Sequence, residues 1–199
     1  FKGIHDLELR YGESGVFVRG KYWYDFELKD EHRELYDIDD SDRKAGAQAS
    51  GGQILDAFIY HNYYINEING SVRVGKQVVS WGESVFIQNS INTVNPYDIA
   101  AFRRPGAEIK EGLIPVNMVY VSQSLGEQLS VEAFYQLQWD KTIVDNCGTF
   151  FSTSDVAAEG CNVGLSMAGS DYNRDDPGYI YVKKKNDREA RDSGQYGVA

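Results

Sequence analysis

Apolar and polar residues alternate with a period of two along two long segments of the chain. From Val16 to Leu28 the even positions are apolar or glycine, and from Leu129 to Trp139 the odd positions are apolar. Because successive side chains of a β-strand point to opposite faces, each segment predicts a strand with one apolar and one polar face. Weaker alternation predicts further strands at residues 55–65, 72–78 and 116–120, a stub at 7–11, and the start of another strand at 193–199.

The connections between these strands alternate between short and long. The short ones, rich in Gly and Asn, are residues 12–15, 66–70 and 125–128; the long ones are residues 29–53, 82–115 and 140–193. Short periplasmic turns with long external loops are typical of outer-membrane β-barrels, whereas compact soluble domains rarely carry structureless loops beyond about 15 residues. The pattern therefore predicts an all-β, antiparallel transmembrane barrel.

The strands have a suitable length for a membrane, but their number is small. The better runs reach the roughly 9 to 11 residues that a tilted strand needs to cross the hydrocarbon core. About six strands are fewer than the eight of the smallest single-chain barrels. We therefore expect residues 1–199 to be one incomplete barrel domain and the natural protein to continue beyond them. A soluble sheet with one solvated face predicts the same alternation and stays an alternative.

Composition narrows the classes of membrane protein and of partner. The 199 residues have a formal net charge of -10 and a mean hydropathy of -0.47, and no apolar run approaches the roughly 18 residues of a membrane helix. A helical membrane protein is thereby excluded, whereas a barrel is compatible because only every second strand residue must face lipid. The negative charge argues against nucleic acid as a partner.

The segment from Ser84 to Pro115 carries the strongest candidate for a functional site. Its Asn95-Pro96-Tyr97-Asp98 motif predicts a short helix to about Phe102, with Asn95 as the N-cap. A dense group of charges follows, comprising Arg103, Arg104, Glu108, Lys110 and Glu111. If this loop folds inward, these charges would constrict a lumen; ion pairs that brace the loop against the strands explain them equally well.

Charged residues of both signs occupy the polar strand face and are candidates for the lumen. They are Arg19, Lys21, Asp25, Glu27, Asp56, Arg73, Gln77, Glu132 and Gln136. Such a lumen would be polar and wet, without a preference for either sign of ion. Aromatic residues near the long loops fit a girdle at the membrane interface; they are Tyr22, Tyr24, Phe26, Trp81 and Trp139.

The remaining reactive residues point to structure and not to catalysis. Cys147 and Cys161 lie in one polar loop, and a disulfide between them would contribute roughly 3 kcal/mol by closing a loop of about 15 residues. Gly82-Glu83-Ser84 begins like a nucleophile elbow but lacks its closing Gly. Neither a P-loop nor a dinucleotide fingerprint occurs. We expect no enzymatic activity, no metal and no cofactor.

Several motifs resemble a proteobacterial family of large outer-membrane proteins of unknown function. They are Trp-Gly-Glu-Ser at residues 81–84, the eleven residues from Phe102 to Gly112, Ala-Phe-Tyr-Gln at 133–136, and Asp-Asn-Cys-Gly-Thr-Phe-Phe at 145–151. The likeness spans nearly the whole chain. It implies a barrel, an envelope location, an exporter-type partner in the inner membrane, and traffic in lipid-like or aromatic compounds.

Together these observations predict an outer-membrane channel or transport component for hydrophobic small molecules. Its partners would be membrane lipid, lipopolysaccharide and a periplasmic or inner-membrane transport protein, with the oligomeric state left open. The alternatives are a non-conducting scaffold for binding or adhesion, and an outer-membrane enzyme whose catalytic residues lie in another part of the protein.

Overall fold

Antiparallel strands dominate the computed structural model, which describes residues 1–30, 45–81, 94–103, 109–145, 150–152, 164–168, 178 and 180–199. The strands are β1 (Lys2–Tyr11), β2 (Ser14–Tyr24), β3 (Ser50–Ile65), β4 (Ile68–Gln77), β5 (Val116–Ser124), β6 (Ser130–Gln136), β7 (Gly164–Ala168), β8 (Ile180–Lys183) and β9 (Tyr196–Val198). The helical segments are α1 (Phe26–Lys29), a 3-10 turn η1 (Ala45–Ala47), α2 (Ile99–Arg103) and α3 (Ile109–Gly112). The described part of the chain contains no helix with the length and apolar character of a membrane span.

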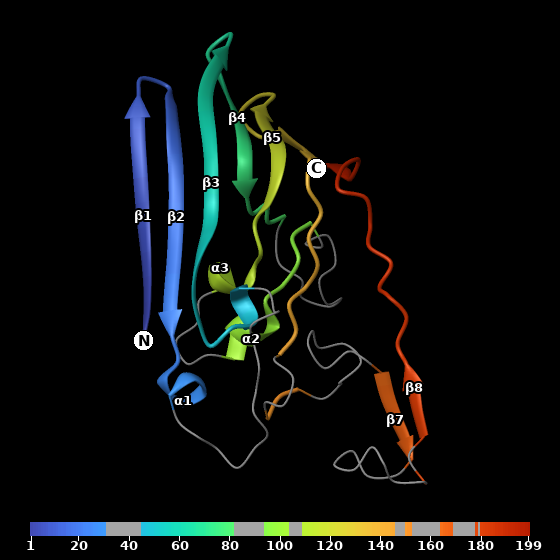
Figure 1. The fold of residues 1–199 in the computed structure, drawn as a ribbon. Helices are drawn as coiled ribbons and strands as arrows, with labels where there is room; N and C mark the ends of the chain where they lie inside the picture. Colours follow the sequence, from blue (N-terminus) through green and yellow to red (C-terminus); the bar gives the residue numbers. More distant parts are fainter. Residues whose placement is uncertain are drawn as a thin grey trace.

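One seven-stranded sheet runs in the order β1-β2-β3-β4-β5-β6-β9, and every neighbouring pair is antiparallel. β7 and β8 form a separate two-stranded sheet. The tight turns of β1-β2, β3-β4 and β5-β6 lie at one end of the main sheet, and the helices lie toward the other (Figure 1). The predicted all-β, antiparallel fold is therefore confirmed.

The short turns have the backbone geometry that their residues favour. Asn66 and Glu67 both have positive φ, at 49° and 66°, which is the condition for the two-residue turn that suits the twist of a hairpin. Gly12 likewise has a φ of 56°, where the missing Cβ removes the steric cost. These turns fix the register of the hairpins on either side of them.

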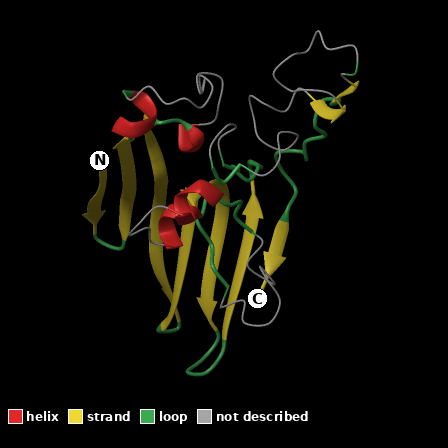
Figure 2. Cartoon of the chain, turned by 90° about the horizontal axis from the view of Figure 1, so that it is seen from below, coloured by secondary structure: helices red, strands yellow, loops and turns green. Residues whose placement is uncertain are grey.

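The register places apolar side chains on one face across the whole sheet. A single row of cross-strand partners joins all seven strands, and we call it the outer row: Leu9, Val16, Ile59, Val74, Val119, Tyr135 and Tyr196. Most of its members are exposed, including Leu9, Ile59 and Tyr196. The apolar face of the sheet is thus exposed at most of these positions. Figure 2 shows the strands of the main sheet side by side, with the helices near one end of them.

The opposite face, called the inner face below, contains the buried residues of the sheet. A core cluster of Val79, Val116, Met118, Tyr120 and Phe134 lies toward the end with the long connections. Trp81 and Val94 pack against it. The hydrophobic core of the described chain is therefore small and concentrated near β4, β5 and β6, and the remaining inner face carries polar and charged side chains.

The predicted strand from Val16 to Leu28 is too long. β2 ends at Tyr24, and the carboxylate of Asp25 accepts hydrogen bonds from the backbone N–H groups of Glu27 and Leu28, which caps α1. The prediction of Asp25 and Glu27 as strand residues is wrong for this reason, and their place in a lumen stays a prediction. The residues after Asp25 continue the alternation that predicts a strand. An aspartate is also a favoured N-cap, however, and here it begins a helix.

Other boundaries also differ from the prediction. β3 begins at Ser50, inside the segment predicted as a loop to Gln53, because Gly51 and Gly52 carry no side chains that could show alternation. Gly51 lies close to the Trp23 ring, since a Cβ there would come within 3.1 Å of it. The predicted loop 140–193 contains the hairpin of β7 and β8.

We predict that Gly75→Ala destabilises the sheet by about 1–3 kcal/mol, because Gly75 has a φ that other residues rarely adopt. Its φ is 134°, and an added Cβ would come within 2.4 Å of the Ala57 carbonyl oxygen and 2.8 Å of Phe58 Cα. The midpoint of urea unfolding measures the effect. Gly126→Ala is the matched control, because its Cβ would meet no atom within 4 Å. Equal midpoints for both variants would contradict the strain.

Candidate functional site

A network of ion pairs lies on the inner face across β1, β2 and β3. The Arg19 guanidinium binds the Asp6 carboxylate through two hydrogen bonds of 2.7 Å, and its Nη1 lies 3.5 Å from Asp56 Oδ2. Asp56 lies at the irregularity where the pairing of β2 and β3 shifts between Val18 and Gly20. This shift gives Arg19 a carboxylate on each neighbouring strand, so its charge is well compensated.

Toward the short turns the network continues through aromatic rings. The Tyr60 hydroxyl donates to Glu8 Oε1 at 2.5 Å and accepts from Arg10 Nε at 3.4 Å. The Arg73 guanidinium lies 4.2 Å from the centroid of the Tyr120 ring and 5.6 Å from that of Phe58. Arginine stacked on rings in this way keeps its charge while it packs against the inner face.

Lys21 and Glu132 also lie on the inner face, as predicted. Lys21 is buried, with its ammonium 5.2 Å from the centroid of the Trp23 ring. Glu132 Oε2 accepts a hydrogen bond of 2.8 Å from Trp81 Nε1. Arg19, Lys21, Arg73 and Glu132 therefore lie on one face of the sheet. The alternation of side chains along each strand was sufficient to predict this.

The charge cluster after Phe102 is held to other elements by ion pairs. Arg103 pairs with Asp145, and its guanidinium lies 4.8 Å from the centroid of the Phe151 ring. Both carboxylate oxygens of Glu111 accept hydrogen bonds from Lys2 Nζ, at 2.8 and 2.9 Å. Arg104, Glu108 and the side chain of Lys110 lie outside the described residues. The described charges thus brace the segment, and their part in a constriction stays a prediction.

The short helix predicted in this segment is present, but it begins later. Asp98 Oδ1 accepts from the backbone N–H of Ala101 and caps α2, which starts at Ile99. The prediction of Asn95 as the N-cap is wrong. Asn95 is buried and its amide binds the backbone of Gln77, Val79 and Ile114, so it joins the ends of β4 and β5.

A cavity of about 630 Å³ on the inner face was not predicted from the sequence. Its walls come from residues after β4, before α2, around the end of β6, and at β9. Trp81, Tyr97, Phe134 and Trp139 contribute rings to it. Trp81 is therefore part of an inner cluster and not of an outer girdle, and its ring lies 5.1 Å from that of Phe134. These residues lie far apart in the sequence, and no motif joins them.

In the described segment after β8, the Asp187 carboxyl has a shifted pKa. Lys184 lies 2.7 Å from Asp187, and its hydrogen bond lowers the pKa of the Asp187 carboxyl.

The predicted disulfide partners Cys147 and Cys161 lie outside the described residues. Within the part of the chain that the structure describes, no group of three or more His, Cys, Asp or Glu side chains could hold a metal ion.

Comparison with known proteins gives a family for the complete segment. Residues 1–199 match the family described as "Protein of unknown function (DUF1302)". The chain belongs to the DUF1302 family. No curated protein and no solved structure matches it significantly. The predicted membership in a family of unknown function is therefore confirmed, while the outer-membrane association of that prediction is not tested by the match.

In this DUF1302 chain we predict that Lys2→Met lowers the free energy of unfolding by about 1–3 kcal/mol, because Glu111 loses its ammonium partner. The Glu111 side chain is only 3% exposed and that of Lys2 is 30% exposed. Urea unfolding measures the loss, and Lys2→Met combined with Glu111→Gln should restore most of it. Lys184→Met is the control, since the Lys184 pair with exposed Asp187 should contribute much less than the pair of Lys2 with buried Glu111. If Lys2→Met lowers the free energy of unfolding no more than the control does, the ion pair of Lys2 and Glu111 does not stabilise the protein.

Proposed function

We propose that this chain is part of an outer-membrane β-barrel of a Gram-negative bacterium, which acts as a channel or transport component for hydrophobic small molecules. The observation that carries the proposal is the outer row, which joins all seven strands with apolar side chains that no other described element covers. Soluble monomers rarely expose a contiguous apolar patch larger than a few hundred Å². In a barrel, this face would contact the lipid chains.

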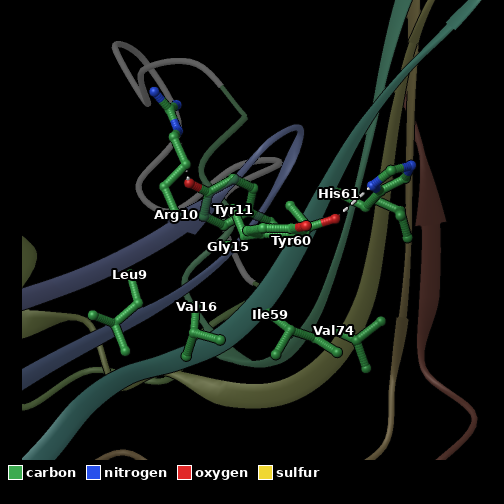
Figure 3. Close-up of a pocket in the computed structure, with 11 residues that line it drawn as sticks. Leu9, Arg10, Tyr11, Gly15, Val16, Ile59, Tyr60, His61 and Val74 are labelled. Atoms are coloured by element: carbon green, nitrogen blue, oxygen red, sulfur yellow. Dashed lines mark hydrogen bonds between the residues drawn. The ribbon is translucent and has the colours of Figure 1, made fainter.

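The outer face also contains an apolar groove that suits lipid contact. The groove has a volume of about 460 Å³ and crosses β1 to β4. Figure 3 shows Leu9, Val16, Ile59 and Val74 in a row on one side of the sheet, with Arg10 and Tyr60 on the other side. Because alternate residues of a strand point to opposite faces, the apolar side chains lie on the outer face and the polar ones on the inner face of the same strands.

The inner face supports a water-filled lumen. Its ion pairs and stacked arginines include Arg19 with Asp6 and Arg73 with Tyr120. Charged side chains that face lipid destabilise a barrel by about 2–4 kcal/mol at the middle of the membrane, so a face of this kind must point to an aqueous interior. Passage would be passive, since the sequence has no nucleotide-binding motif. Because both signs are present and paired, it would show no strong selectivity for ions.

The segment with α2 and α3 would shape this lumen at the end with the long connections. Its anchors reach opposite parts of the sheet, since Glu111 binds Lys2 on β1 and Arg103 binds Asp145 after β6. A segment fixed at both sides can narrow an opening without moving. Its further partners, lipopolysaccharide and a periplasmic or inner-membrane transport protein, are proposed from the resemblance described above.

A non-conducting scaffold for binding or adhesion is the second candidate. The hairpin of β7 and β8 favours it, because this hairpin forms a sheet of its own and lies away from the main sheet on the side of the long connections (Figure 1). Single-channel recording separates the two functions. A membrane-inserted protein without conductance would favour the scaffold.

Placing a charge in the outer row tests the lipid contact. We predict that Ile59→Arg lowers the stability of the folded protein by about 2–4 kcal/mol in lipid bilayers and reduces its assembly into outer membranes. The control is Leu125→Arg at a short turn, because Ile59 is 57% exposed and Leu125 55% exposed in the described chain. Assembly is measured by membrane fractionation and by the gel shift between heated and unheated samples. A water-soluble species near 22.4 kDa that shows no shift would overturn the membrane proposal.

Removing the two arginines tests the constriction. We predict that the double variant Arg103→Ala and Arg104→Ala changes the single-channel conductance, because at least Arg103 is anchored beside the inner face through Asp145. Arg188→Ala, an exposed arginine before β9, is the control. Unchanged conductance of a well-folded double variant would exclude a role for these arginines in the constriction.

A further inference from the structure

We propose that the outer-face groove binds one molecule of phosphatidylethanolamine, with an acyl chain in the groove and an ester carbonyl at Ser14 and His61. The groove volume of about 460 Å³ lies within the roughly 300–1,000 Å³ that is usual for small-molecule sites. The inference deepens the proposed function and rests on it for the presence of a bilayer beside this face. It adds a preferred lipid at a fixed position to a face that otherwise contacts any acyl chain.

The apolar part of the groove comes from four neighbouring strands. Its row of cross-strand partners is visible in Figure 3 and consists of Leu9, Val16, Ile59 and Val74. An acyl chain can lie against this row, but every lipid of a bilayer carries such a chain. Selection of one lipid must therefore come from polar groups at the groove.

Such polar groups lie at the side of the groove nearest the short turns. Ser14 Oγ and His61 Nδ1 are 2.8 Å apart, and both residues line the groove. They lie on the outer face, two positions from Val16 and Ile59 along β2 and β3. In either tautomer of the ring, the pair keeps one hydrogen-bond donor for a third group, which is His61 Nε2–H or the Ser14 hydroxyl. An ester carbonyl is an acceptor that fits this donor.

Two tyrosines indicate that the pair lies at the depth of lipid ester groups. Tyr11 lines the groove and is 91% exposed. Tyr63 lies on the same face of β3, and its ring stacks on that of His61 with a centroid distance of 6.5 Å. Tyrosines of membrane proteins are enriched at the interface between hydrocarbon and headgroups, where the ester carbonyls also lie. A carbonyl would thus meet Ser14 and His61 while its acyl chain follows the groove.

The charge beside the groove favours an ethanolamine headgroup over an anionic one. Glu13 lies in the turn directly before Ser14 and is exposed. Its backbone carbonyl accepts a hydrogen bond of 2.8 Å from the Asn62 N–H, so the turn is fixed against β3 beside the groove. The Glu13 carboxylate attracts the ammonium group of phosphatidylethanolamine and repels the net negative charge of phosphatidylglycerol.

The test measures which lipids the full protein retains. The protein is reconstituted into bilayers of equal parts dioleoyl-phosphatidylethanolamine and dioleoyl-phosphatidylglycerol and extracted with detergent, and native mass spectrometry counts the bound lipids. We expect phosphatidylethanolamine to be retained about 2- to 5-fold more than phosphatidylglycerol. Glu13→Gln should abolish this preference. Glu127→Gln, an exposed glutamate of the turn between β5 and β6, is the matched control and should preserve it.

A double variant tests the contact with the ester group. Ser14→Ala combined with His61→Phe keeps a ring on β3 and removes both polar groups, so retention of phosphatidylethanolamine should fall about 2- to 10-fold. The control combines Ser130→Ala on β6 with His5→Phe on β1, which removes the same groups outside the groove and should leave retention unchanged.

A third variant keeps the test decisive if the double variant does not fold. Val74→Trp fills the groove and should lower retention of both lipids, whereas Val131→Trp on the outer face of β6 should not. Equal retention of both lipids by the unchanged protein, or retention that ignores these substitutions, would overturn the inference.

Other occupants of the groove give different results. Preferred retention of oleic acid added to the same bilayers, or a dimer that Val74→Trp dissociates, would overturn the inference by assigning the groove to a fatty acid or to a second copy of the chain. A conducting protein without selective retention would overturn the lipid site alone. Selective retention from detergent micelles by a protein that does not insert into bilayers would support the site and contradict the barrel, and no insertion with no retention would overturn both.

Discussion

The antiparallel register of the main sheet is the constraint on which every other feature depends. Side chains alternate between faces, so a slip of one residue between any two strands would bring apolar residues of one strand beside charged residues of the next. The positive φ angles of Asn66 and Glu67 fix the register of β3 and β4, and the pairing of Val74 with Val119 carries it to β5. The outer row and the inner network exist together only because this register is maintained from β1 to β9.

This separation of faces explains why the inner face needs so many specific contacts. The buried core near Met118 and Tyr120 is small, so most inner side chains do not gain stability from apolar packing alone. Arg19 is held between carboxylates of β1 and β3, and Arg73 lies over the Tyr120 ring. Such contacts keep charges satisfied at a face that is only partly dry. The anchors of α2 and α3 follow the same principle, because they too join charged groups of distant segments.

Sequence alternation was sufficient to predict the strands and the inward side chains of β2, β4 and β6, since the period of two is a local property. It was insufficient wherever a local pattern fits two structures. Asp25 continues the strand alternation and yet caps a helix. The motif around Asn95 resembles the start of a helix, but the amide of Asn95 binds the backbone at the ends of β4 and β5. The cavity was missed for another reason: its walls meet only after folding, so the sequence places Trp81 and Trp139 merely near strand ends.

The distribution of chemistry across the sheet suggests how the inner face would handle a hydrophobic molecule. One row of cross-strand partners carries Arg10 on β1, Tyr60 on β3, Arg73 on β4 and Phe134 on β6, and the Trp81 ring lies against Phe134. A ligand held by the rings beside β6 would meet charged, hydrated groups beside β1 to β4, where an apolar surface gains nothing. In a barrel this asymmetry would keep a hydrophobic molecule on the β6 side of the lumen unless another element accepts it. The transport partner proposed above would supply such an element, and the scaffold alternative would not require one.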